Sequence, residues 1–297
     1  MTLSVDSAIT EVRGLAAELG LEVTPVVLAD RSNLVLRLDP HPLVARVAMA
    51  TSLVRVGMTW LRREIEVTRW LAERGGPAAL VTRPATRVDP GPHERAGLVI
   101  SLWDLEEVLP LPHRVDPAAA GMALGEIHRA LAAYDPEALP VWGAWDEARL
   151  VMERARTSPF FEASERLVVE RSFEDATKIV ESAGARTASF QAVHGDAHIG
   201  NVLATPRGAV WTDWEDAFLG PCEYDLACLR SRADLFGEER EAIEAMTSAY
   251  GERCDYDVTL AAELGFVRNV QVIVWLAVFA ERHPELLPRM KARIAKL

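Results

Sequence analysis

The strongest constraint on the fold is the stretch HGDAHIGN, which runs from His194 to Asn201. Asp213 follows twelve residues after Asn201. Between them, the strand-like runs VLA and AVW flank the turn TPRG, a pattern that predicts a β-hairpin. A hairpin returns the chain close to its starting point, so we expect Asp196, Asn201 and Asp213 to converge on one site.

The residue types at this site favour metal-dependent phosphoryl transfer. Carboxylate and amide oxygens, without cysteine, suit a hard cation such as Mg²⁺. A further carboxylate can orient the attacking hydroxyl. The spacing H-x-D-x-x-x-x-N also matches the protein-kinase catalytic loop, with Gly195 in place of its arginine and Asp213-Trp214-Glu215 in place of D-F-G. The alternative is a loop that only caps and turns the chain.

The segments HGDAHIGNVL and TDWEDAFLGPCEYDLACL closely resemble the aminoglycoside phosphotransferase and choline kinase-like superfamily, most strongly over residues 191–229. This resemblance implies an α+β, bilobal protein-kinase-like fold, with a small β-rich N-lobe and a larger, mostly helical C-lobe. It also implies phosphorylation of small-molecule hydroxyls with ATP and Mg²⁺. By resemblance, Asp196 is the catalytic base, and Asn201 and Asp213 are the magnesium ligands.

The same resemblance assigns supporting roles to neighbouring residues. His194 and His198 are expected to order the loop, since a structural role is the better expectation for a lone histidine. Glu215 is a candidate for assisting a second metal ion or a metal-bound water. Asp225, in the run EYDLA, corresponds to a position that braces the catalytic loop and is expected to support it without taking part in the chemistry.

The layout of the chain agrees with two lobes, residues 1–103 and residues 104–297. The first contains a helix at 60–74 and the strand-like runs LEVTPVVLA, NLVLRL, PLVARVAM, ATRV and AGLVISLW, with the turn DPGP expected between the last two. The second shows helical patterns at 117–133, 146–157, 164–182, 222–236, 238–250 and from 259 to the C-terminus. A β island at 191–212 interrupts them.

A kinase-like N-lobe should carry a basic residue that is paired with a helix glutamate. All three lysines, Lys178, Lys291 and Lys296, lie beyond residue 103. Arg46, in the run LVARV, is therefore the best-placed basic residue. Glu64 falls on the apolar face of the helix at 60–74, where an acid needs a partner, and Arg46 would be that partner. The alternatives are a solvent-facing arginine and a glutamate that reaches water.

The expected phosphate loop has no glycine between Thr24 and Leu38, so it has no G-x-G-x-x-G motif. The run DRSN stands where the phosphate loop is expected, and Ser32 and Asn33 are expected near the phosphates. Adenine is expected against the backbone from Ser101 to Trp103, with Leu102 or Trp103 packing nearby. The alternative for Trp103 is plain core packing.

Charge and composition limit the partners. Residues 1–100 carry a net charge of +1 and residues 101–297 one of −13. An acidic second part argues against nucleic acid and suits a cationic small molecule, although solubility alone would explain it. No apolar run reaches the ~18 residues of a membrane span. The three cysteines have neither metal-site nor disulfide spacing. The N-terminus has no secretory features, so we expect a cytoplasmic protein.

The sequence therefore predicts an ATP- and Mg²⁺-dependent O-phosphotransferase. The first choice of acceptor is an aminoglycoside or a similar cationic or polyhydroxylated compound, with a role in antibiotic resistance. Kinases of choline, homoserine, methylthioribose, fructosamine and natural-product alcohols remain alternatives. A catalytically silent ATP-binding protein is another, since the glycines and the lysine are missing. A protein kinase is disfavoured, because there is no A-P-E motif and little room for an activation loop between Glu215 and Pro221.

Overall fold

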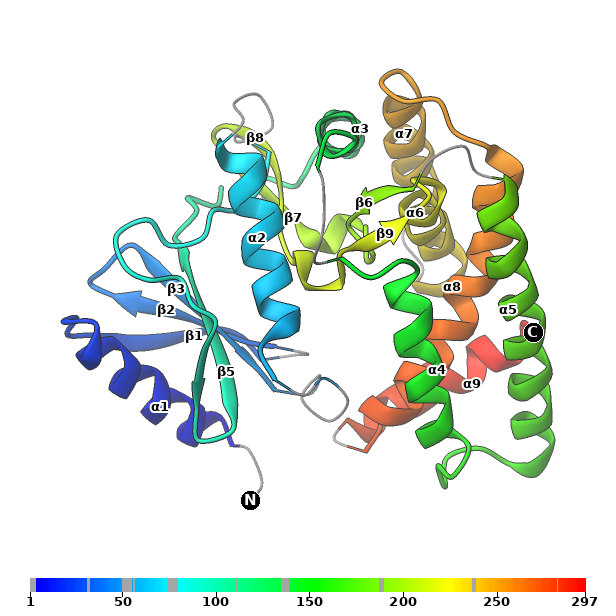
Figure 1. Ribbon diagram of the computed structural model, residues 1–297, viewed down its shortest axis with the longest axis horizontal. Helices are drawn as coiled ribbons and strands as arrows, with labels where there is room; N and C mark the ends of the chain where they lie inside the picture. The colour runs from blue at the N-terminus through cyan, green and yellow to red at the C-terminus, as the bar shows by residue number, and fades with distance from the viewer. Residues whose placement is uncertain are drawn as a thin grey trace. The chain divides into compact units, whose positions relative to one another are not determined.

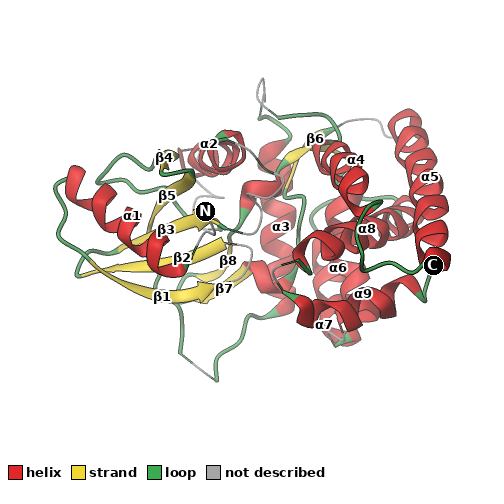
Figure 2. Cartoon of the chain, turned by 90° about the horizontal axis from the view of Figure 1, so that it is seen from below, coloured by secondary structure: helices red, strands yellow, loops and turns green. Residues whose placement is uncertain are grey.

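The computed structural model describes residues 4–30, 33–49, 55, 57–73, 80–110, 112–134, 139–186, 190–236, 239–281 and 283–297, with side chains for all of these except 185 and 232–236. The chain forms two compact units. The first comprises residues 1–113 and 204–215, and the second comprises residues 114–203 and 216–297. Figure 2 shows that the first unit is rich in strands and the second in helices.

The main sheet of the first unit is antiparallel throughout. Its strands are β1 (Thr24–Asp30), β2 (Asn33–Asp39), β3 (Leu43–Ala48), β4 (His93–Arg95) and β5 (Leu98–Asp104). They lie in the order β1-β2-β3-β5-β4. Figure 1 labels β1, β2, β3 and β5, and Figure 2 labels all five strands. Alternate residues of a strand face opposite sides of a sheet. One side of β2, β3 and β5 therefore packs against α1 (Val5–Glu18), and the other side carries Arg46.

Helix α2 (Thr59–Glu73) has the amphipathic face that its spacing predicts. Its buried residues are Leu61, Arg63, Glu64, Ile65, Val67, Thr68 and Leu71. Glu64 is fully buried. A charged group therefore lies where apolar spacing alone would place a hydrophobic side chain, and it needs compensation from another element.

One strand expected from the sequence is displaced. The run ATRV at 85–88 is not a strand, and the partner of β5 is β4. Prolines at 84, 90 and 92 lack the N–H donors that a ladder requires. The hairpin instead turns at Ala96 and Gly97, whose φ values of 48° and 80° suit a two-residue turn.

The first unit extends past Trp103, where the lobe boundary was expected, as far as His113, and it also includes residues 204–215. Two backbone hydrogen bonds tie these segments to the unit. Leu105 N donates to Pro42 O at 2.9 Å, and Leu109 N donates to Ala204 O at 2.8 Å.

The second unit is mainly helical. Its helices are α3 (Pro117–Leu131), α4 (Gly143–Ala155), α5 (Ala163–Arg186), α6 (Glu223–Phe236), α7 (Arg240–Gly251), α8 (Val258–Phe279) and α9 (Leu287–Ile294). The last helical stretch is thus broken, and a proline at 284 begins a short 3-10 turn in the break. The predicted hairpin is present as β7 (Val202–Thr205) and β8 (Gly208–Trp211), and from Ala204 onward it belongs to the first unit. A further short strand, β9 (Phe218–Gly220), pairs with β6 (Gln191–Val193).

Within the described residues, α8 is the one helix long and apolar enough to cross a membrane. Most of its apolar stretch is buried, and it packs against α4, α5, α6 and α9. These contacts identify α8 as the central core helix of the second unit. It carries one arginine, Arg268, near its middle.

Candidate active site

The loop from His194 to Asn201, here called the HGDAHIGN loop, begins directly after β6 and ends in a 3-10 turn at Ile199–Asn201. Gly195 has a φ of 84°, in the region that favours glycine. A Cβ atom at this position would collide with the carbonyl oxygen of Asp216. This contact explains why glycine stands where protein kinases carry arginine.

Asp225, at the start of α6, braces this loop from behind. Its carboxylate accepts hydrogen bonds from the backbone N–H groups of His194, at 2.7 Å, and Gly195, at 2.8 Å. It also lies 2.9 Å from Nε2 of His128, a residue of α3 that the sequence analysis did not single out. All three polar partners are thus on the loop or behind it, so Asp225 has the bracing geometry expected for it.

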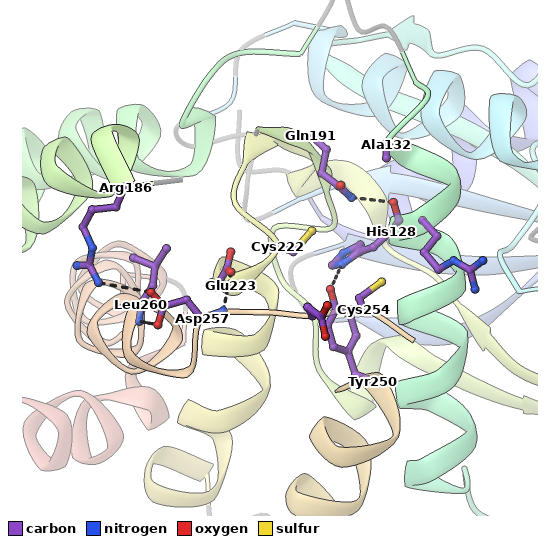
Figure 3. Close-up of a pocket in the computed structure, with 12 residues that line it drawn as sticks. His128, Ala132, Arg186, Gln191, Cys222, Glu223, Tyr250, Cys254, Asp257 and Leu260 are labelled. Atoms are coloured by element: carbon purple, nitrogen blue, oxygen red, sulfur yellow. Dashed lines mark hydrogen bonds and ion pairs between the residues drawn. The ribbon is translucent and has the colours of Figure 1, made fainter. Parts of the chain in front are cut away.

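His128 is held between two elements. Its Nδ1 lies 2.9 Å from the hydroxyl of Tyr250 in α7. Figure 3 marks this contact with a dashed line. Burial lowers the pKa of His128, but Cys222 and Asp225 outweigh burial and raise that pKa to about 10. The imidazole is therefore a buried cation with both nitrogens engaged. It borders a pocket of about 530 Å³ that is also lined by Tyr250 and Cys254.

Asp196 projects from the HGDAHIGN loop with 28% of its side chain exposed. Its Oδ1 contacts Nη2 of Arg268, and its Oδ2 lies 3.5 Å from Nε2 of His198. Burial opposes ionisation, but Arg268 and His198 outweigh it and lower the pKa of the Asp196 carboxyl. The group is therefore an ionised, partly accessible carboxylate.

Arg268 was missed by the sequence analysis. It lies 72 residues beyond Asp196 in the chain, and no local spacing links the two residues. One signal was present, because Arg268 is a lone cation within the apolar run of α8. A charge in such a place needs a partner.

A second cluster of charges lies in the first unit. Nη1 of Arg46 forms the expected ion pair with Glu64. Nη2 of Arg46 donates to Oδ1 of Asp213 at 2.6 Å and lies 3.6 Å from Glu215. The backbone N–H of Trp214 also donates to Glu64, at 3.0 Å. Strand β3, helix α2 and the segment after β8 thus meet at one guanidinium.

The electrostatics of this cluster follow from its burial. Burial raises the pKa of Glu64 above its usual value, although Arg46 acts in the opposite direction. Burial also opposes the charge of Arg46, but Asp213, Glu64 and Glu215 together raise its pKa above its usual value. Three carboxylates crowd around one guanidinium, which is an arrangement that favours additional positive charge.

Both carboxylate oxygens of Glu215 accept hydrogen bonds from other side chains. Its Oε1 accepts from Nη1 of Arg55 at 3.0 Å, and its Oε2 accepts from Nδ2 of Asn33 at 3.0 Å. These contacts favour a role in holding β2 and the segment at Arg55 together over assistance to a second metal ion. Asn33 uses its amide N–H for this contact, and Ser32 lies outside the described residues.

Ser101 and Trp103 are buried in the sheet. Nε1 of Trp103 donates to Oγ of Ser101 at 2.9 Å. The backbone around them is also paired: Leu102 N donates to Pro90 O at 2.9 Å, and Asp104 N donates to Arg83 O at 3.0 Å. The side chains expected beside adenine therefore satisfy each other within the core.

The oxygen ligands fit a magnesium ion that takes few protein ligands. In the described part of the chain, no three His, Cys, Asp or Glu side chains gather as a metal site. Mg²⁺ commonly takes one or two carboxylates and completes its shell with water and phosphate oxygens. Asn201 donates its Nδ2 to the carbonyl of Asp196 at 3.0 Å, which leaves Oδ1 as its ligand atom. Asp213 has a φ of 69° and a side chain that is 29% exposed.

The candidate residues divide between the two units. Asp196, Asn201, His194, His198 and Asp225 belong to the second unit. The described candidate residues of the first unit are Asn33, Arg46, Glu64, Ser101, Trp103, Asp213 and Glu215. The convergence of Asp196 and Asn201 with Asp213 therefore stays a prediction.

Comparison with known proteins identifies a family. The model of the Phosphotransferase enzyme family matches residues 25–259. Comparison with curated proteins finds no match. Among solved structures, amicoumacin kinase hAmiN in complex with AMP-PNP and Ca²⁺ has a TM-score of 0.72 at 15% identity, covering 99% of this chain and 94% of that one.

Two further structures share the fold. A microcompartment-associated aminopropanol kinase has a TM-score of 0.74 at 15% identity, covering 98% of this chain and 96% of that one. A choline/ethanolamine kinase family protein from Mesorhizobium loti has a TM-score of 0.64 at 15% identity, with coverages of 98% and 92%. The predicted kinase-like fold, with a sheet-rich N-terminal part and a helical C-terminal part, is confirmed.

Proposed function

The chain belongs to the Phosphotransferase enzyme family, and from this premise we propose that it transfers the γ-phosphoryl group of ATP to a hydroxyl of a small amine-bearing alcohol. That it is a small-molecule kinase follows from the family and from the kinases that share its fold. The use of Mg²⁺, the nature of the acceptor, the site residues and a cytoplasmic location are our proposals.

The observation that carries the proposal is the state of Asp196. Its carboxylate is ionised and partly exposed, and its loop is fixed by Asp225 through two backbone N–H groups. In this role Asp196 orients the acceptor hydroxyl and accepts its proton as the oxygen attacks phosphorus. Positioning of this kind is the main protein contribution to phosphoryl transfer.

The charge cluster of the first unit supports the nucleotide side of the reaction. We assign Asp213 and Asn201 as the residues that would hold Mg²⁺. When bound, the ion would neutralise charge on the triphosphate. Arg46 would add a fixed cation there, and Glu64 keeps its guanidinium in place through their buried ion pair. Asn33 and Glu215 would support this cluster indirectly, through the hydrogen bond between their side chains.

The adenine contact is proposed further along the chain than the sequence suggested. Ser101 and Trp103 use their side chains on each other, and the backbone at Leu102 and Asp104 is paired. The loop that follows β5 begins at Leu105. We therefore assign the backbone of residues 106–108 to adenine.

The acceptor proposal rests on charge. The helical part carries most of the chain's negative charge, which favours an amine-bearing alcohol such as an aminoglycoside or an amino alcohol. The solved kinases of this fold act on different acceptors, including aminopropanol and amicoumacin. The alternatives are other small alcohols, among them sugars and hydroxy amino acids.

The experiment is ADP release from ATP and Mg²⁺ with a panel of aminoglycosides, other antibiotics, amino alcohols and sugars. Asp196→Asn serves as the blank. We expect acceptor-dependent ADP release that disappears in the variant. Equal release by the wild type and by Asp196→Asn on every acceptor would contradict the role of Asp196.

One observation favours a second candidate, a catalytically silent ATP-binding protein. The phosphate loop contains no glycine, and Arg46 stands in place of lysine while already contacting Glu64 and Asp213. This candidate predicts Mg²⁺-dependent ATP binding by calorimetry without ADP release on any acceptor.

A further inference from the structure

The carboxylate of Asp196 is held unequally at its two oxygens. Oδ1 contacts the guanidinium of Arg268, whereas among the described residues Oδ2 has only the longer 3.5 Å approach of His198 Nε2. A strong charge-assisted hydrogen bond is much shorter than that, at ~2.7–2.9 Å. Oδ2 is therefore the oxygen with capacity to accept a further hydrogen bond.

The guanidinium of Arg268 is itself fixed from behind. Its Nη1 donates to Oε1 of Gln271 at 3.0 Å, one turn further along α8. The same Oε1 accepts from the hydroxyl of Tyr224 in α6. Nε2 of Gln271 donates to the carbonyl of Ala144 in α4, at 3.1 Å. Gln271 thus has both ends of its amide engaged, and three helices determine where Arg268 points.

General packing does not require this arrangement. Asp196 is partly exposed and could be solvated by water. Arg268 has only 14% of its side chain exposed and lies in the apolar core helix. Placing an ion pair there costs desolvation energy that a hydrophobic side chain at position 268 would avoid. The pairing therefore points to a requirement on the orientation of Asp196.

We propose that Arg268 is a positioning residue of the acceptor site, which holds Oδ1 of Asp196 so that Oδ2 meets the acceptor hydroxyl. This inference rests on the proposed function, because it assumes that Asp196 receives the hydroxyl. Arg268 acts through Asp196 and needs no contact with the acceptor. Through Arg268, the contacts among α4, α6 and α8 also fix the orientation of the Asp196 carboxylate.

The kinetic test uses Arg268→Gln and Arg268→Lys, with Arg154→Gln as the matched control. Arg154 also joins two segments through a carboxylate, Glu281, but its pair is exposed. We expect Arg268→Gln to lower kcat by roughly tenfold to a hundredfold, because misplacement of a reacting group has effects of that size. The KM for ATP should remain nearly unchanged. Arg268→Lys should recover part of kcat, and Arg154→Gln should leave both constants unaltered.

A structural test needs no turnover. Crystal structures of the wild type and Arg268→Gln should show the same main chain at 194–201 and a displaced carboxylate of Asp196. An unmoved carboxylate, or an unchanged kcat, overturns the proposal. Thermal unfolding confirms that each variant is folded, and Arg268→Lys gives a second structure if Arg268→Gln does not fold.

Failure of the proposed function and failure of the role of Arg268 give different experimental results. If the wild type shows no acceptor-dependent ADP release that Asp196→Asn abolishes, the proposed function fails. The crystal structures then still decide whether Arg268 positions Asp196.

Discussion

Asp225 and His128 form a buried ion pair, with 2.9 Å between Oδ2 and Nε2, directly behind the HGDAHIGN loop. The same carboxylate accepts the backbone N–H groups of His194 and Gly195. One side chain therefore joins α3 and α6 to the loop that presents Asp196. The position of Asp196 depends on this link.

Asp225→Asn should destabilise the protein and slow phosphoryl transfer. The substitution leaves the His128 cation buried without its carboxylate, and breaking a buried pair costs about 3–5 kcal/mol. Urea denaturation measures this loss as a lower free energy of unfolding. Asp175→Asn is the control, because Asp175 forms an exposed pair with Lys178 in α5 and such pairs contribute little. Equal losses in the two variants would contradict the prediction.

The pH dependence of stability should reveal His128. Its pKa rises from 6.5 to about 10 on folding, so the folded state binds the proton more tightly than the unfolded state. The resulting stabilisation is complete below pH 6.5, declines as the pH rises, and is absent above pH 10. The free energy of unfolding of the wild type, minus that of His128→Asn, should therefore shrink over this interval. Tyr250 and Cys222 also border His128 and can titrate. The same comparison is therefore repeated with Tyr250→Phe and with Cys222→Ser, and the pH dependence should persist in both if it belongs to the histidine. A constant difference would contradict the assignment.

The local parts of the site could be predicted from the sequence because their spacing is short. The HGDAHIGN loop, the hairpin after it and the segment at Asp213 all follow from residues within twenty positions of one another. The Arg46–Glu64 pair could be predicted as well, since helix periodicity places Glu64 on the apolar face and the absence of lysine before residue 103 leaves Arg46 as the best-placed basic residue. In that case, one unsatisfied buried acid pointed to its partner.

The contacts that fix the loop in the second unit could not be predicted. His128 lies 97 residues before Asp225, and Arg268 lies 72 residues after Asp196. Neither distance is encoded in a local pattern, because helix packing brings these residues together. The strand at His93 was missed for another reason. The run ATRV looked more strand-like, but the prolines around it prevent a ladder.

Gly195→Ala should destabilise the protein more than Gly97→Ala. Both glycines have positive φ, 84° and 80°, so alanine costs about 1–2 kcal/mol at each from backbone strain alone. At Gly97 the added methyl group meets nothing within 4 Å, whereas at Gly195 it collides with Asp216 O. Chemical denaturation should show the larger loss for Gly195→Ala, together with reduced kcat. Equal stabilities would mean that the backbone at Asp216 yields to the methyl group.

Arg46→Ala should raise the KM for ATP and lower stability. The change leaves Glu64 fully buried without its cation, and the expected loss is about 3–5 kcal/mol. Arg37→Ala is the matched control on the neighbouring strand, since its pair with Asp39 is exposed. That variant should keep both the KM for ATP and the stability almost unchanged. Steady-state kinetics with varied ATP and urea denaturation give the two readouts.

Asp213→Asn should remove the effect of Mg²⁺ on nucleotide binding. Asp213 is the most exposed carboxylate of the Arg46 cluster, so it is the one best able to reach a metal ion that also binds phosphate. Calorimetry with ATP, with and without Mg²⁺, should show tighter binding with the metal in the wild type and no such increment in Asp213→Asn. Asp104→Asn provides the control, because that carboxylate accepts hydrogen bonds from Thr86 and has no contact with Arg46. If Asp213→Asn retains the full increment, the metal is held elsewhere, and the crowded carboxylates around Arg46 serve only to hold that arginine in place.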